Sequence, residues 1–256
     1  MKIYKLALLV TGLAAGWATA TMAYAKPKAT AATSAAVEPQ ALQALQRMSA
    51  YLGTIGKFEI KADTTLDQVY RNGQKLQFGG TIEYKVARPG GFMISVATDR
   101  KVRKFYYDGK TLTMYGPVAG LYATIDAPPT IRELMDVLYT NYDVDLPLMD
   151  LFRWSDPNNG RSEHLDSGIL VGYAKINGVD TQHYAFREGG VDWQVWIAEG
   201  DRPLPLKFVI TSTWLSGQPQ FTSVLKWDEK PSFSSDEFSF KPPAGTARID
   251  MERKKN

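Results

Sequence analysis

Apolar and polar residues alternate one by one along most of this chain, and this two-residue period restricts the fold to one built mainly from β-strands. Between residues 57 and 70 the even positions are mostly apolar and the odd positions are mostly charged. An Asn-Gly pair at 72–73 separates this segment from a second alternating segment over 75–86, which predicts a β-hairpin. These two strands are expected to pair antiparallel, with one dry face and one wet face.

The same pattern continues on both sides of a central break at residues 126–129. Further strands are predicted over 92–98, 101–107, 111–115, 168–176, 181–187, 192–198, 206–214, 221–227 and 237–241. Asp-Gly, Asn-Gly and Gly-Gly pairs between several of them are typical hairpin turns. Because twisted open sheets of about ten or eleven strands rarely stay flat, we expect this sheet to curl into a half-open antiparallel β-barrel.

Two segments have instead the 3.6-residue period of amphipathic helices. The first runs from Glu38 to Ile55, with Pro39 suited to the first helical position. The second follows Thr130, which can cap a helix over 131–139, and a short helix is also plausible over 146–152. The sequence therefore predicts an α+β fold: the half-open barrel, an N-terminal helix and a central helical lid over its concave face.

The first 25 residues have the parts of a secretory signal peptide: a positive start, an apolar stretch over 6–15 and the small-x-small motif Ala23-Tyr24-Ala25. Cleavage is predicted after Ala25. A retained membrane anchor is the alternative, but the apolar stretch is shorter than the roughly 20 residues that a spanning helix requires. We therefore expect an exported protein, with a bacterial periplasm as the best-fitting compartment.

The rest of the chain divides into three parts. Residues 26–36 lack large apolar side chains and are predicted to form a flexible leader. Residues 37–250 are expected to form one domain, and 251–256 a basic tail exposed to solvent.

Composition excludes several classes of function. The chain has no cysteine, and so no disulfide, thiolate metal site, cysteine nucleophile or lipid-modified N-terminal cysteine. Without the predicted signal, 28 Lys and Arg face 27 Asp and Glu, a net charge of +1. Because nucleic-acid affinity depends largely on clustered positive charge, nucleic acid is not an expected partner.

No motif for catalysis, metal binding or phosphate binding stands out, so we predict a non-enzymatic protein without a cofactor or metal. The chain lacks a Gly-x-Ser-x-Gly elbow and a glycine-rich phosphate loop. The spacing of the carboxylates at 143, 145 and 150 matches no calcium loop. Of the two histidines, His164 is expected to be a capping or surface residue and His183 a hydrogen-bonded residue within a strand. A hydrolase using His183 with a strand carboxylate such as Asp192 remains a competing hypothesis.

Large aromatic residues and methionines recur on the predicted strands, and two interpretations of them stay open. They can form an ordinary core with one surface for a partner protein. Alternatively, the curved sheet has more apolar concave surface than its helices cover and leaves a pocket for an acyl chain. The predicted pocket residues are Phe58, Phe78, Tyr84, Phe92, Tyr106, Met114, Trp193, Phe208 and Trp214.

Three segments resemble the periplasmic lipoprotein carriers of the LolA family. They are the Arg-Pro strand connection within residues 80–92, the Tyr-Asp-Gly-Lys-Thr-Leu run at 107–112, and the ending Phe-Ser-Phe-Lys-Pro-Pro-Ala-Gly at 238–245. In that family an arginine of the Arg-Pro motif holds the lid helices. The resemblance therefore implies that Arg88 acts as a lid latch.

Over nearly the whole expected mature chain, the sequence is more similar to an exported bacterial family, domain of unknown function 2092 (DUF2092), in the same LolA/LolB-like group. The segments that carry this resemblance are 48–52, 107–112, 146–151, 183–187, 192–197 and 199–205. The resemblance implies a half-open barrel with a helical lid over an apolar cavity.

Pattern and resemblance together predict a periplasmic carrier or binding protein. Its ligand would be hydrophobic, either a lipid or the acyl chain of a lipoprotein, and its donor or acceptor could be a membrane-associated protein. The alternative is a periplasmic scaffold that binds a partner protein through exposed aromatic residues and has no cavity.

Overall fold

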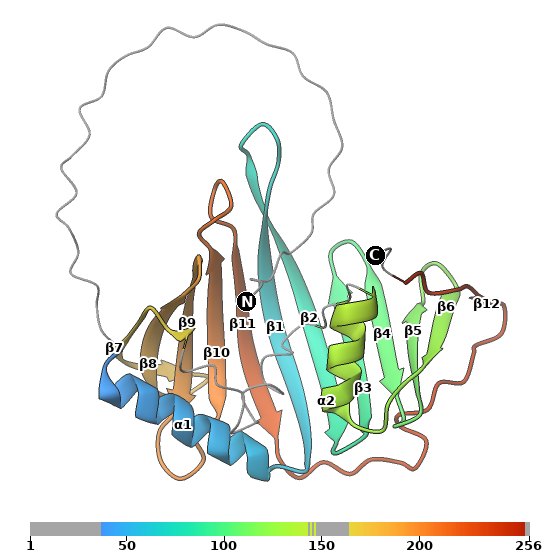
Figure 1. Cartoon of the computed structure of the whole chain (residues 1–256), viewed down its shortest axis with the longest axis horizontal. Coiled ribbons are helices and arrows are strands. Elements are labelled where there is room, and N and C mark those ends of the chain that lie inside the picture. The colour runs from blue at the N-terminus through green and yellow to red at the C-terminus, as the bar shows by residue number, and fades with distance from the viewer. Residues whose placement is uncertain (1–36, 143, 145, 147–163, 254–256) are drawn as a thin grey trace, which may run out of the picture.

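The computed structural model describes residues 37–142, 144, 146 and 164–253 (Figure 1). The predicted signal peptide and leader, and the predicted helix over 146–152 beyond its first residue, lie outside the described residues. So do the carboxylates at 143, 145 and 150 and the last three residues of the predicted tail. The predicted domain bounds and cleavage site stay predictions.

Helix α1 (Pro39–Thr54) forms where the sequence predicts it, with Pro39 as its first residue. Its buried residues, Ala41, Ala44, Met48 and Leu52, recur at the spacing of one helical face. The helix is attached to the sheet at both ends. At its start the Glu38 backbone N–H donates to the Gly168 carbonyl at 2.8 Å. Near its end the Tyr51 hydroxyl donates to the Glu229 carboxylate.

Twelve strands form one sheet. In sheet order, the strands are β12 (Ala247–Arg248), β6 (Leu121–Asp126), β5 (Thr111–Gly116), β4 (Val102–Tyr107), β3 (Gly91–Thr98), β2 (Lys75–Ala87), β1 (Lys57–Val69), β11 (Gln220–Asp228), β10 (Pro205–Ser212), β9 (Val191–Ala198), β8 (Val179–Glu188) and β7 (Ser167–Ile176). All pairs are antiparallel except β12 with β6. The sheet stays open, because β12 and β7 are its two edges. The expected half-open antiparallel architecture is confirmed.

Three details differ from the predicted strands, one of them the additional two-residue strand β12. Strand β6 is additional, and it pairs with β5 over six residues. The strand predicted over 237–241 is wrong, since this segment forms no ladder. Its alternating Phe238 and Phe240 pack against the sheet instead: Phe240 lies 5.1–5.4 Å from three tyrosine rings. A two-residue period therefore reflects packing on a sheet surface here, not membership of the sheet.

Helix α2 (Ile131–Val137) continues into a π-helical turn, η1 (Leu138–Tyr142). The predicted cap is confirmed, because the Thr130 hydroxyl accepts from the Glu133 backbone N–H at 3.2 Å. The Ile131 backbone N–H donates to the Pro89 carbonyl at 2.9 Å, which joins the start of α2 to the β2–β3 turn. Both helices lie on the same face of the sheet, with α1 along its lower end and α2 in front of β3 (Figure 1).

One hydrophobic core lies between this face and the two helices. It includes Met48 and Leu52 from α1, Leu134 from α2, and the fully buried strand residues Tyr84 and Phe92. The helices therefore cover part of the predicted concave face. Among the described residues, none of the helices has the length and apolar character needed to cross a membrane.

Candidate ligand-binding face

One row of side chains on the concave face is apolar in six neighbouring strands. The register pairs Phe78 with Leu66, Leu66 with Phe221, and Phe221 with Ile210. It then pairs Ile210 with Trp193 and Trp193 with Phe186. These six residues, called the apolar row below, cross strands β2, β1, β11, β10, β9 and β8. With strands about 4.8 Å apart, the row extends for about 24 Å.

The apolar row is only partly covered. All its members except Phe186 are half-buried, whereas the concave residues nearer the lower end of β1 and β2, such as Ile60 and Tyr84, are buried. The Trp193 and Phe186 rings stack with centroids 4.3 Å apart. At the other end, the Arg100 guanidinium lies over the Phe78 ring at 5.3 Å. The apolar row thus lies between the packed core and the solvent-exposed ends of the hairpins.

The next row toward the core has small residues on its three central strands. Gly80, Thr64 and Ser223 occupy the paired positions on β2, β1 and β11. A Cβ at Gly80 would lie 2.8 Å from the Ala97 carbonyl oxygen, so a larger residue would require a shift of the backbone. The Ser223 hydroxyl is buried without a hydrogen-bond partner. Side-chain volume on the face is therefore lowest beside the apolar row.

Seven of the nine predicted pocket residues lie on the concave face. Phe58, Tyr84, Phe92 and Phe208 are buried in the core. Phe78, Met114 and Trp193 are half-buried. The structure therefore brings these side chains to one face, but four of them already pack against protein. Contact of any of them with a ligand stays a prediction.

Tyr106 and Trp214 do not join this group. Tyr106 points to the opposite, convex face, because its neighbours Phe105 and Tyr107 lie on the concave face of β4. Its ring packs on Phe240 at 5.4 Å. Trp214 follows the end of β10 and is 43% exposed. The expectation that Tyr106 lines the pocket is therefore wrong, whereas the expectation for Trp214 stays a prediction.

Four members of the apolar row were not among the predicted pocket residues: Leu66, Phe186, Ile210 and Phe221. Leu66 could have been found from the Asn-Gly turn, since this turn fixes the register of β1 against β2. The β1–β11 pairing joins strands that are about 150 residues apart in sequence, as in the pair Leu66 and Phe221. No local pattern sets that register.

Arg88 lies at the lower end of β2, where the Arg-Pro connection leads into β3. Its guanidinium is 5.8 Å from the centre of the Phe58 ring, and burial lowers its pKa. The next residue, Pro89, accepts the Ile131 backbone N–H of α2. The connection therefore contacts the lid helix through its main chain. A latch role for the Arg88 side chain stays a prediction.

His183 and Asp192 do not form a catalytic pair. His183 lies on the convex face, stacked on Trp196 at 3.9 Å with its Nε2 2.9 Å from Gln194 Oε1. Burial lowers its pKa. Asp192 lies opposite Arg187, four residues further along the strands, so the two side chains are about 13 Å apart along the ladder. The arrangement proposed for a hydrolase is therefore wrong.

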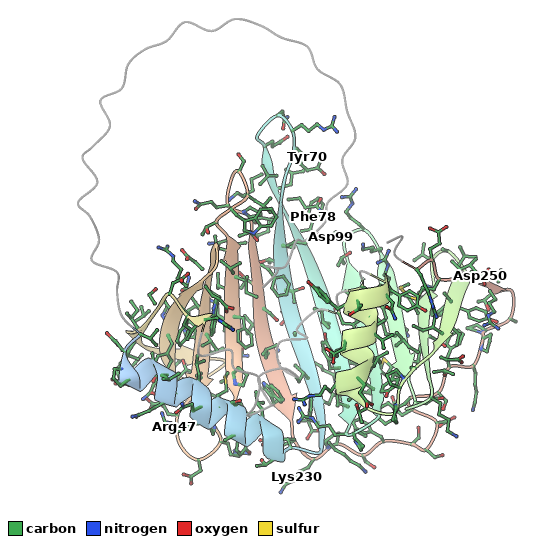
Figure 2. All side chains as sticks on the ribbon, in the orientation of Figure 1. Arg47, Tyr70, Phe78, Asp99, Lys230 and Asp250 are labelled. Carbon is green, nitrogen blue, oxygen red and sulfur yellow. The ribbon has the colours of Figure 1, made fainter. Side chains whose placement is uncertain are left out.

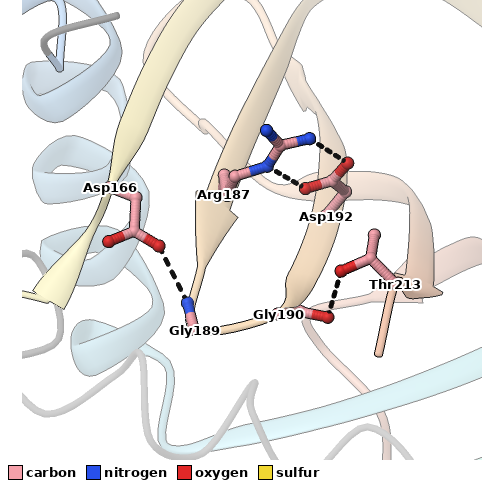
Figure 3. A network of polar contacts seen from close by, with 6 residues as sticks. All are labelled: Asp166, Arg187, Gly189, Gly190, Asp192 and Thr213. Carbon is pink, nitrogen blue, oxygen red and sulfur yellow. Dashed lines mark hydrogen bonds and ion pairs between the residues drawn. The ribbon is translucent and has the colours of Figure 1, made fainter. Parts of the chain in front are cut away.

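Asp192 belongs instead to a polar network at the β8–β9 turn (Figure 3). Two Arg187 nitrogens donate to its carboxylate at 2.6 and 2.7 Å and lower the Asp192 pKa. The turn is held from both sides. The Gly189 backbone N–H donates to Asp166 at 2.9 Å, and the Thr213 hydroxyl donates to the Gly190 carbonyl at 2.5 Å. These contacts fix the turn that joins Trp193 to Phe186.

Two hollows lie at the lower end of the sheet, away from the apolar row. One, of about 50 Å³, lies beside Arg47 and Gln182, and the other, of about 250 Å³, lies beside Tyr173 and Asp180. Both are smaller than the roughly 300–1,000 Å³ of typical ligand pockets. Within the described parts of the chain, no group of three His, Asp or Glu residues is placed to hold a metal ion. The acyl-chain cavity stays a prediction.

One protein family matches most of the chain. The sequence profile of the family described as "Predicted periplasmic protein (DUF2092)" matches residues 41–252. No curated protein is significantly similar in sequence.

Several solved structures are similar in fold. LprF from Mycobacterium bovis is 14% identical, with a TM-score of 0.49 over 80% of this chain and 100% of that chain. The MucA/MucB complex of Pseudomonas aeruginosa contains a chain that is 18% identical, with a TM-score of 0.43 over 79% of this chain and 61% of that chain. A putative outer membrane lipoprotein-sorting protein domain from Vibrio parahaemolyticus is 10% identical, with a TM-score of 0.35 over 78% and 97%.

Proposed function

Because the chain belongs to the DUF2092 family of predicted periplasmic proteins, we propose that it is a non-enzymatic periplasmic binding or carrier protein for a hydrophobic ligand. The ligand is a lipid or the acyl chain of a lipoprotein. It lies against the concave face, along the apolar row. The observation that carries the proposal is the continuity of this row across six strands while five of its members remain half-buried.

The energetics of such a ligand favour transfer over permanent storage. Burial of an acyl chain of about 14 methylenes contributes about 11 kcal/mol relative to water, at roughly 0.8 kcal/mol for each methylene. A membrane provides the same stabilisation, so exchange between membrane and protein is nearly neutral. A small conformational cost in the protein can then decide whether the ligand is taken up or released.

Helix α2 is the element best placed to supply that cost. Its first N–H is bound by the Pro89 carbonyl, and the Tyr107 hydroxyl donates to the Pro128 carbonyl at 2.5 Å just ahead of it. The start of the helix is therefore fixed to the sheet. Movement of its far end, around η1, would change access to the concave face, and Arg88 would act as a latch beside the fixed end.

Ligand binding is tested by placing one charge on either face of the same strand. Ile210→Glu puts a carboxylate in the apolar row, whereas Val209→Glu puts it at the neighbouring half-buried position on the convex face. Titration with a fluorescent fatty acid should show at least tenfold weaker binding for Ile210→Glu and unchanged binding for Val209→Glu. Urea denaturation of both variants measures any difference in stability.

Two results would contradict the proposal. One is the absence of lipid binding by the purified protein, measured with the fatty-acid probe and by mass spectrometry of material extracted under native conditions. The other is equal weakening by both variants at equal stability, which would place the ligand away from the apolar row.

A protein-binding scaffold is the second candidate, and the exposed edge strand β7 favours it. Ile169, Val171 and Tyr173 are 39%, 50% and 68% exposed along this edge. Within the described chain, only the start of β7 is covered, by Val37 and Glu38. Exposed apolar edge strands are ready sites for the addition of an extended peptide. The occupant in this case is an extended segment of a partner protein.

The scaffold candidate has its own test. A photocrosslinker at Tyr173 should capture one protein in cells, and the purified partner should slow amide exchange of β7 residues 172–176. Val171→Lys should abolish both effects, whereas Val118→Lys, at an 82% exposed site elsewhere, should change neither. Unchanged amide exchange with the captured protein would contradict strand addition.

A further inference from the structure

The β1–β2 hairpin projects beyond the rest of the sheet. Pairing of β1 with β11 ends at Leu66, and pairing of β2 with β3 ends at Gly80, yet β1 and β2 remain paired with each other as far as Val69 and Lys75. Three residues of β1 and five of β2 project in this way, a length of about 10–17 Å at 3.3 Å per residue. In Figure 1 this hairpin extends furthest from the lower end of the sheet, where α1 lies.

Exposed apolar side chains gather at the same end of the sheet. Successive antiparallel pairing brings the β1–β2, β3–β4, β5–β6, β8–β9 and β10–β11 turns to this end, called the hairpin rim below. Five of the eleven large hydrophobic residues that are exposed in the described chain lie on the rim: Tyr70, Leu76, Val118, Leu121 and Trp214. Tyr70 and Leu76 flank the tip of the projecting hairpin, at 43% and 37% exposure.

Positive charge lies between and beside these apolar residues. The β1–β2 and β3–β4 hairpins carry Arg71, Lys75, Arg100, Lys101 and Arg103 against Asp67 and Asp99, which gives a net charge of +3. Burial and the nearby charges of Arg103 and Arg100 lower the Lys101 pKa, so these cations lie close enough to repel one another. Figure 2 shows Tyr70, Phe78 and Asp99 together in this part of the molecule.

The two acidic residues do not neutralise the outer surface. Asp99 accepts from the Gly79 backbone N–H at 2.7 Å. Asp67 is only 8% exposed, and it accepts from Gln77 at 3.2 Å and lies 3.6 Å from Lys75. Arg71, Lys101 and Arg103 are exposed, whereas Lys75 pairs with Asp67 and Arg100 lies over the Phe78 ring.

Other parts of the surface do not share this charge. At the lower end, cations at 47, 57, 202 and 230 face anions at 199, 201, 228 and 229, so the charges cancel. At the β8–β9 turn, Asp166, Glu188 and Asp192 outnumber Arg187. The positive charge on the side of the rim formed by β1–β4 is therefore not shared by these two regions.

We propose that the β1–β2 and β3–β4 hairpin tips dock on the surface of an anionic phospholipid bilayer. Tyr70 and Leu76 would enter the interfacial region, because amphipathic aromatic and apolar side chains are stabilised there. The cations between them, together with those of the neighbouring tip, would contact lipid phosphates. The +3 charge of this side and its alternating apolar and cationic groups complement such a surface. An acidic partner protein would account for the cations but not for the exposed apolar residues at the tip.

This docking also determines which end of the concave face lies toward the bilayer. Phe78, a member of the apolar row, lies below the projecting tip and contacts Arg100 of the neighbouring hairpin. A bilayer at the hairpin rim would thus lie beside Phe78, at the half-buried end of the apolar row. The packed core at the lower end of the concave face would lie further from the bilayer. The docking itself does not require a ligand, so it can be tested independently of the proposed carrier function.

The test is co-sedimentation of the exported protein with vesicles. Vesicles of phosphatidylcholine mixed with phosphatidylglycerol should bind the protein at low salt, and vesicles of phosphatidylcholine alone should bind it much more weakly. Arg71→Gln with Lys101→Gln should weaken binding about 25-fold, since each cation near an anionic surface contributes about fivefold. The matched control, Lys57→Gln with Lys230→Gln, removes two exposed cations at the lower end and should leave binding unchanged.

The apolar contribution has a separate variant. Tyr70→Ser with Leu76→Ser should weaken binding about tenfold and leave its salt dependence unchanged, because it removes only buried apolar area. Equal binding to both kinds of vesicle, equal effects of the two charge variants, or no binding to either vesicle would each overturn the proposal. A fatty-acid titration of the same samples reports the carrier function separately.

Discussion

The C-terminal segment stabilises the sheet from its convex face, and removal of one side chain tests this. Phe240 contacts the rings of Tyr106, Tyr115 and Tyr122 at 5.4, 5.3 and 5.1 Å, from three adjacent strands. Phe240→Ala removes all three contacts. The variant therefore tests whether the segment around Phe240 covers the convex face of β4–β6 or leaves it available for other contacts.

The expected loss of stability follows from these contacts. A fully buried Phe→Ala change costs about 3–5 kcal/mol, and each aromatic pair contributes about 0.5–1.5 kcal/mol. Because Phe240 is half-buried, we expect Phe240→Ala to lower the free energy of unfolding by about 2–3 kcal/mol. For a domain of about 200 residues this corresponds to a decrease in Tm of about 5–10 °C.

Urea denaturation followed by tryptophan fluorescence measures this loss, with Ser239→Ala at the exposed neighbouring position as the control. Fatty-acid affinity should not change, because Phe240 lies on the face opposite the apolar row. A loss below about 1 kcal/mol would refute the packing argument. A fall in affinity as large as that of Ile210→Glu would refute the assignment of the ligand to the concave face.

Two further predictions concern the attachment of α2. Burial raises the pKa of Tyr107 to about 12, above its value of about 10 in the unfolded chain, so its contribution to stability is complete below about pH 10 and is lost as the pH rises toward 12. Tyr107→Phe should lower the free energy of unfolding by about 1–2 kcal/mol at neutral pH and remove this part of the alkaline loss. Urea denaturation of the wild-type and Tyr107→Phe proteins between pH 9 and 12 measures both effects. Equal losses of stability in the two proteins would contradict the role given to the Tyr107 hydroxyl. A Cβ at Gly90 would lie 2.5 Å from the Pro129 carbonyl oxygen, so Gly90→Ala should cost about 1–3 kcal/mol, whereas Gly56→Ala, with open space around its Cβ, should cost far less. Equal unfolding free energies of these two variants would show that the β2–β3 turn does not pack closely on the start of α2.

Most of the secondary structure follows from local patterns. The helix starting at Pro39, the hairpin at the Asn-Gly pair and the cap at Thr130 each depend on residues within one or two turns of chain. Such features are specified by short-range chemistry, and the structure has them where the sequence predicts them.

The face that a residue occupies is harder to predict. On β4 both faces carry aromatic residues, so alternation alone does not say that Tyr107 is in the core and Tyr106 on the convex side. The difference is set by Phe240, more than 130 residues later in the chain, which covers Tyr106. The same long-range packing explains why the segment around Phe240 has the period of a strand without being one.

The candidate site shows the same limit. Individual aromatic residues such as Phe78 and Trp193 were identifiable from the sequence. Their arrangement in one row depends on the pairing of β1 with β11, which joins distant parts of the chain within the sheet. Because a shift of this register by one residue would turn every side chain of β11 to the other face, the row exists only in the folded protein.

The most direct test of the proposed function is photolabelling with a fatty acid that carries a diazirine near the end of its chain, followed by mass spectrometry of the labelled peptides. The predicted result is labelling of residues in the apolar row, at Leu66, Ile210 or Phe221, that an excess of unlabelled fatty acid prevents. Labelling confined to convex or edge residues such as Val209 or Val171, or labelling that unlabelled fatty acid does not reduce, would contradict a ligand site on the concave face.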